Sequence, residues 1–150
     1  MSDLSFLDAA LAEAKAASSE GEVPVGAVLV QNGTVLSRGR NARERLQSPL
    51  SHAEIHAIET AAKELGSWRL SGCELYVTLE PCPMCLAACQ QARLSRVVYG
   101  AKDPKGGALS LGYALNADER TNHRFSVEYV EHPECGSILT EFFRQRRKQE

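Results

Sequence analysis

The chain has 150 residues and a mass of 16.4 kDa, which suits one domain of ordinary size over residues 1–150. Its 43% hydrophobic and 24% charged residues are typical of a globular protein and argue against disorder, collagen and coiled coil. The net charge of -2 excludes broad coating of nucleic acid, so any contact with nucleic acid must come from a local patch.

The first part of the chain predicts a helix, a hairpin and a second helix. Apolar residues at three- and four-residue spacing indicate the first helix, which Gly21 ends. Asn32-Gly33 lies between two apolar runs and favours a tight hairpin turn. In chain order we predict a helix over residues 3–19, strands over 23–30 and 34–37, a polar loop over 39–51 and a helix over 51–65.

The second part predicts a parallel crossover followed by a strand and a helix. A strand, a helix and a strand in that order place the two strands parallel in one sheet. We predict strands over residues 73–79, 96–99 and 125–130 and helices over residues 83–93 and 133–147. Residues 101–122 receive no assignment. These elements add up to an α/β domain of three layers, α/β/α, with one mixed sheet of about five strands.

No apolar run reaches 18 residues, and the first eleven residues carry no basic side chain. We therefore expect neither a membrane span nor a signal peptide, and we expect the protein to be cytoplasmic, where thiols stay reduced. The five cysteines are then metal ligands, nucleophiles or core residues. Cys73, Cys89 and Cys135 have no partner by spacing, so we expect them to be buried core residues.

The chemistry is concentrated in His52-x-Glu54 and Pro81-Cys82-x-x-Cys85. Zn²⁺ prefers thiolate and imidazole, and a catalytic zinc site has three protein ligands with a fourth position for water. Pro83 fits the first position of a helix, whose positive end favours the thiolates of Cys82 and Cys85. Cys-x-x-Cys alone is equally compatible with a redox or structural site, and His56 is a less favoured fourth ligand of a structural zinc.

Glu54 has two interpretations. Because residues two apart on a helix point to different sides, Glu54 is poorly placed to share a metal with His52. It could instead move a proton between water and a substrate nitrogen. Ser51 and Glu54 also match a capping box, which would give Glu54 a structural role. Beside the metal motif, we favour the catalytic role.

These motifs resemble those of the cytidine deaminase superfamily. Further segments are similar to the bacterial tRNA-specific adenosine deaminase family, and the resemblance covers residues 4 to 148. The segments are 22–28, 75–80, 100–103, 121–124 and 142–147, together with Asn41, eleven residues before His52. Residues 106–115 depart from the Gly-Ala-x-Gly-Ser-Leu pattern that we expect in the family.

The resemblance implies a cytidine-deaminase-like fold and a zinc enzyme that converts the wobble adenosine of a tRNA to inosine, typically an arginine tRNA with anticodon ACG. It implies one Zn²⁺ per subunit on His52, Cys82 and Cys85, with Glu54 as the proton shuttle. It also implies a homodimer that binds the anticodon loop. Substrate contacts are implied for Asn41, Glu22, Val23, Asp103 and Lys102, and contacts with the RNA backbone for Arg144, Arg146 and Arg147.

Two other functions remain open at this point. A free-base deaminase, for guanine or cytosine, would have the same fold, but it would not need the basic C-terminal segment. A non-catalytic, zinc-stabilised RNA-binding subunit would not need Glu54. For the basic segment alone, a solvated helix end stabilised by the helix dipole is the simpler interpretation.

Overall fold

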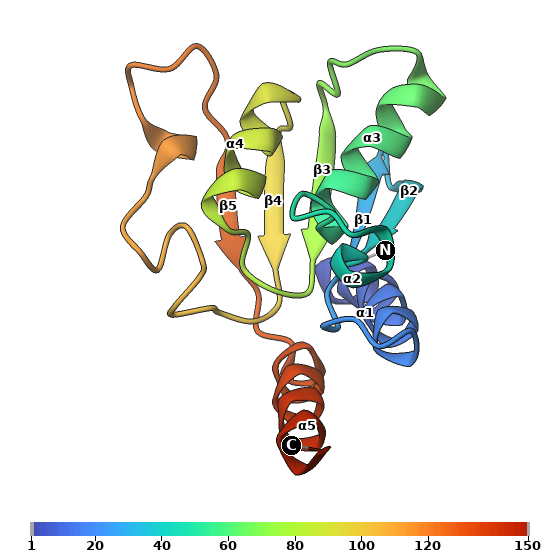
Figure 1. The fold of residues 1–150 in the computed structure, drawn as a ribbon. Coiled ribbons are helices and arrows are strands. Elements are labelled where there is room, and N and C mark those ends of the chain that lie inside the picture. Colours follow the sequence, from blue (N-terminus) through green and yellow to red (C-terminus); the bar gives the residue numbers. More distant parts are fainter. Residues whose placement is uncertain (1, 150) are drawn as a thin grey trace.

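Within residues 2–149, which the computed structural model describes, five strands form one mixed sheet in the order β2-β1-β3-β4-β5 (Figure 1). β1 is antiparallel to both of its neighbours, whereas β3, β4 and β5 are parallel. The strands are β1 Gly26–Gln31, β2 Thr34–Arg40, β3 Cys73–Val77, β4 Arg96–Tyr99 and β5 Ser126–Tyr129. The helices are α1 Asp3–Ser19, α2 Arg43–Leu46, α3 Ala53–Leu65, α4 Pro83–Gln91, the 3₁₀ turn η1 Leu115–Ala117 and α5 Pro133–Gln149.

The predicted three-layer arrangement is confirmed. Alternate residues of β1 and β3 point to opposite faces, so Leu29 and Leu75 pack with α3 and α4 while Val28 and Tyr76 pack with α1. Figure 1 shows α3 and α4 on one face, and α5 beyond the carboxyl ends of the three parallel strands. None of the helices in residues 2–149 is long and apolar enough to span a membrane.

The hairpin prediction is confirmed, but the strand limits differ from the predicted ones. Asn32 and Gly33 both have positive φ, at 50° and 76°, as a tight turn between antiparallel strands requires. β1 begins at Gly26 rather than at Val23, because Pro24 lies in a turn that the Val25 N–H closes on the Val23 carbonyl at 2.9 Å.

The prediction of a loop over residues 39–51 was wrong in two places. β2 continues to Arg40, and residues 43–46 form the short helix α2. The strand continues because Gly39 and Arg40 still pair with Ala27 and Gly26 of β1. Gly39 also allows α3 to pack closely, since a Cβ atom there would lie 2.2 Å from the Ala53 carbonyl oxygen. Gly39 therefore places the first turn of α3, which follows His52, directly against the sheet.

The alternative interpretation of Ser51 and Glu54 as a capping box is not supported, because that box does not form. The N-cap residue of α3 is His52, one position later than expected, and its side chain makes no capping hydrogen bond. The His52 ring instead faces the sulfur atoms of Cys82 and Cys85.

Candidate metal centre and active site

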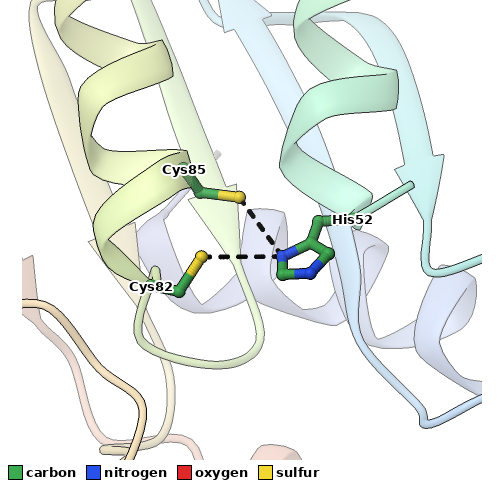
Figure 2. A group of neighbouring side chains, drawn as sticks. All are labelled: His52, Cys82 and Cys85. Carbon is green, nitrogen blue, oxygen red and sulfur yellow. Dashed lines mark hydrogen bonds between the residues drawn. The ribbon is translucent and has the colours of Figure 1, made fainter. Parts of the chain in front are cut away.

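The N-termini of α3 and α4 meet at the carboxyl end of β3, and both N-cap residues belong to the predicted metal motif. His52 caps α3 and Cys82 caps α4, with Pro83 at the first helical position as predicted. Cys85 lies one turn further along α4 and is fully buried. In Figure 2 the two sulfur atoms and the imidazole point toward one another.

The geometry of this cluster fits a zinc ion. His52 Nδ1 lies 3.6 Å from Cys82 Sγ and 3.5 Å from Cys85 Sγ. A tetrahedral ion at the usual Zn–N and Zn–S bond lengths separates nitrogen from sulfur by about 3.6 Å. Within residues 2–149, these three side chains are the only group of His, Cys, Asp and Glu with metal-ligand spacing. His56 is not part of the group.

The electrostatics of the two cysteines are consistent with a cation site. The neighbouring Cys85 thiol, with His52, lowers the pKa of the Cys82 thiol to about 4. Cys82 and burial in turn raise the pKa of the Cys85 thiol. The lowered pKa of Cys82 favours its thiolate form, and a bound cation would favour release of the Cys85 proton, because metal ligands bind in their deprotonated forms.

Glu54 lines the same cavity as His52 and Cys82, and its side chain is buried. Burial raises the pKa of its carboxyl to about 7. A carboxyl group with such a pKa can both accept and donate a proton at neutral pH.

The cavity has a volume of about 690 Å³ and is bordered by several segments that are far apart in sequence. Of the substrate-contact residues that the resemblance implies, Val23, Asn41, Lys102 and Asp103 line it. The Asn41 amide donates to the Val23 carbonyl at 3.1 Å and accepts from the Arg43 N–H at 3.2 Å. An asparagine amide has two donors and two acceptor positions, so one of each is left for a ligand.

Glu22 is not among the residues that line the cavity. Its carboxylate is buried and accepts from the backbone N–H groups of Glu44 at 3.0 Å and Arg45 at 2.7 Å. A carboxylate in this position stabilises the start of a helix. Glu22 therefore holds α2, which carries the cavity residue Arg43, and its influence on the cavity is indirect.

The predicted basic segment lies on the exposed part of α5. Arg144 pairs with Glu141 at 2.9 Å, and the Arg146 guanidinium lies 5.2 Å from the centre of the Phe142 ring. Arg147 is also exposed. The middle of α5 lines the cavity through Leu139, Thr140 and Phe143, and the basic residues follow toward its exposed end.

Sequence reasoning missed three groups of cavity residues. Arg43 was missed because the short helix α2 was not expected. Leu139 and Phe143 of α5 were missed because apolar residues at helical spacing are typical of packing against a core. Glu80 would have been the easiest of these residues to predict, since it directly precedes Pro81-Cys82 in the sequence.

The MafB19-like deaminase family model matches residues 1–147. The tRNA-specific adenosine deaminase of Bacillus subtilis (strain 168) is 49% identical over 144 residues, which cover 95% of this chain and 89% of that protein. This chain belongs to the tRNA-specific adenosine deaminase family.

Two solved structures extend this family assignment. One comes from a study of A-to-I editing by tRNA:A34 deaminases at the wobble position. It has a TM-score of 0.82 and 42% identity, and the match covers 93% of this chain and 99% of that one. The other is a guanine deaminase from Bacillus subtilis, with a TM-score of 0.67 and 31% identity over 98% of this chain and 95% of that one. The cytidine-deaminase-like fold expected from the sequence is thus confirmed.

Proposed function

We propose that this protein hydrolytically deaminates adenosine to inosine at the wobble position of a tRNA, typically an arginine tRNA with anticodon ACG, in the cytoplasm. The observation that carries the proposal is the buried carboxyl of Glu54 in the same cavity as the His52, Cys82 and Cys85 cluster. The choice of substrate is supported by the tRNA-specific adenosine deaminases among the relatives.

His52, Cys82 and Cys85 would hold one zinc ion per subunit, in keeping with their donor set and spacing. When bound, zinc supplies Lewis-acid activation of water near neutral pH.

Glu54 would accept a proton from the attacking water and deliver it to the substrate. The water oxygen bonds to C6 of adenine, the bond from C6 to the exocyclic nitrogen breaks, and that nitrogen leaves as ammonia. The product is inosine, so water and adenosine account for all atoms. The raised pKa of Glu54 suits both the basic and the acidic step.

The remaining cavity residues would bind and orient the nucleotide. Asn41 would use its free donor and acceptor on the flipped nucleotide, and Val23 would pack against it. Lys102 and Asp103 would lie along the RNA near the target ribose. On α5, Arg144, Arg146 and Arg147 would contact backbone phosphates. A homodimer that binds the anticodon loop across its interface completes the proposal, and sedimentation of the zinc-loaded protein would test it.

A deamination panel tests the proposal directly. The zinc-loaded protein is offered tRNA with a wobble adenosine, an anticodon stem-loop, free adenosine, guanine and cytosine. We expect inosine in the RNA samples alone. Ammonia from guanine or cytosine alone would overturn the substrate while keeping the chemistry, an outcome for which the guanine deaminase neighbour gives a precedent. No reaction with any substrate would favour a non-catalytic RNA-binding subunit.

A further inference from the structure

Glu80 is a buried carboxylate next to the metal cluster that the proposed reaction does not use. It lies between the end of β3 and Cys82, it lines the cavity, and only 3% of its surface is exposed. Among residues 2–149 no Lys, Arg or His lies within ion-pair distance of it. A buried charge of this kind must be stabilised by hydrogen bonds.

Those hydrogen bonds come from a single irregular segment, residues 101–112, which lies between β4 and η1. Glu80 Oε1 accepts from the Asp103 backbone N–H at 3.0 Å and from the Ser110 hydroxyl at 2.7 Å. Glu80 Oε2 accepts from the Ser110 backbone N–H at 2.8 Å. One carboxylate thus binds this segment at two points that are seven residues apart.

The segment folds closely around this carboxylate. A Cβ atom at Gly107 would lie 2.2 Å from Glu80 Oε2, so a larger residue would force the carboxylate or the segment to move. Asp103 is fixed further within the segment, because its carbonyl accepts from the Gly107 N–H at 2.8 Å and its carboxylate accepts from the Gly106 N–H at 3.1 Å. Glu80 is therefore the centre around which the segment is ordered.

The same segment supplies Lys102 and Asp103 to the wall of the cavity. It contains no helix or strand that would fix these residues. We propose that Glu80 is a positioning residue, which orders residues 101–112 so that Lys102 and Asp103 engage the substrate RNA. The ordering follows from the contacts of Glu80, whereas the role toward RNA rests on the proposed function.

Amide hydrogen exchange tests the ordering without reference to activity. In the zinc-loaded Glu80→Ala variant, we expect the amides of Asp103 and Ser110 to exchange roughly tenfold faster or more, because both lose a buried acceptor. The amides of β3 and β4 should be unchanged. Glu64→Ala removes an exposed carboxylate at the end of α3 and should leave all these rates alone. Unchanged exchange at Asp103 and Ser110 in Glu80→Ala would overturn the ordering.

Kinetics on an anticodon stem-loop test the positioning. We expect Glu80→Ala to lower kcat/KM by roughly 5- to 150-fold, mainly through KM, at unchanged zinc content. Glu80→Gln keeps one acceptor oxygen and should retain part of the activity. In a variant that already carries Lys102→Ala and Asp103→Ala, the Glu80→Ala change should have little further effect. The full loss in that background would show that Glu80 acts by another route and would overturn the proposal.

Two further outcomes separate the possible causes of failure. If Glu80→Ala does not fold, Ser110→Ala is the substitute, because it removes the hydroxyl contact alone. We then expect a smaller loss of kcat/KM and a smaller increase in amide exchange. A Ser110→Ala variant with unchanged KM and unchanged exchange would count against the proposal. If the wild-type protein deaminates no RNA, the proposed function and the role of Glu80 toward RNA both fail. The exchange rates would still decide whether Glu80 orders the segment.

Discussion

Three buried glutamates, two in the cavity wall and one beside α2, show how the surroundings of a residue decide its role. Glu22 and Glu80 each accept backbone N–H groups from a neighbouring segment, so their charges stabilise local structure. Glu54 lies beside the cysteine and histidine cluster, and burial raises the pKa of its carboxyl to about 7. Of the three, Glu54 is therefore the one suited to proton transfer at neutral pH.

Replacing Glu54 with Gln tests this role. The change keeps the shape of the side chain but removes its ability to exchange a proton, so we expect kcat to fall by roughly 10²- to 10⁴-fold. Zinc content and thermal unfolding temperature, measured on the same sample, should stay close to those of the wild type. A variant that deaminates at the normal rate would refute the assignment of the general acid and base.

At the scale of the elements, α5 differs from the other helices because it extends beyond the sheet (Figure 1). Residues between Gly136 and Phe143 line the cavity, whereas the last turn carries three exposed basic residues. Such residues are also favoured by the negative end of a helix. The position of the helix, leading outward from the cavity, is what supports a contact with RNA.

The salt dependence of RNA binding distinguishes the two interpretations of α5. Each phosphate contact contributes roughly -0.7 to -0.9 to the slope of log K against log salt concentration. Replacing Arg144, Arg146 and Arg147 with Ala should weaken binding and reduce the magnitude of this slope by about 2. Arg38→Ala, which removes an exposed cation from the edge strand β2, serves as the control. An unchanged slope would identify α5 as a solvated helix end.

At the scale of the whole molecule, Arg96 connects four elements. Its guanidinium contacts Asp3 of α1 at 2.8 Å, Glu74 of β3 at 3.1 Å and Glu128 of β5. The hydrogen bond from Arg96 lowers the pKa of the Asp3 carboxyl. A lowered pKa means that Asp3 contributes stability above its unfolded pKa of about 3.9, and that this contribution is lost as the pH falls through the folded value.

We therefore expect Arg96→Met to reduce the free energy of unfolding by about 1–2 kcal/mol at pH 7, since the network is partly exposed. The difference between variant and wild type should shrink as the pH falls below about 4, where the carboxylates become protonated. Urea unfolding at a series of pH values measures both effects. A difference that stays constant down to pH 2 would indicate that packing of the arginine side chain, rather than its charge, matters.

The metal would connect the starts of α3 and α4, whereas the hydrophobic core is formed by the sheet and the helices on both its faces. Removing zinc with a chelator should therefore lower the unfolding temperature without unfolding the protein at 25 °C. Cys82→Ala should abolish tight zinc binding and show the same lower unfolding temperature. Loss of native circular dichroism on chelation would instead mean that the fold depends on the metal.

The local features of this protein could be predicted from its sequence. Helix periodicity, the Asn32-Gly33 turn and the spacing of Cys82 and Cys85 depend on neighbouring residues. The turn and the cysteine pair were found where expected, and the four predicted helices were found with ends within two residues of the expected ones, whereas the short helix α2 was not expected. The proximity of His52, Cys82 and Cys85 was predictable for a further reason, since a zinc site would be limited to few residue types.

The walls of the cavity could not be predicted in the same way. Which residues surround it depends on the strand order β2-β1-β3-β4-β5 and on where the irregular segments return to the sheet. Glu22 next to α2, Glu80 next to residues 101–112 and Phe143 in the cavity wall are contacts between distant parts of the chain. No short-range pattern marks them, because the energy of each contact exists only after the sheet has brought its partners together.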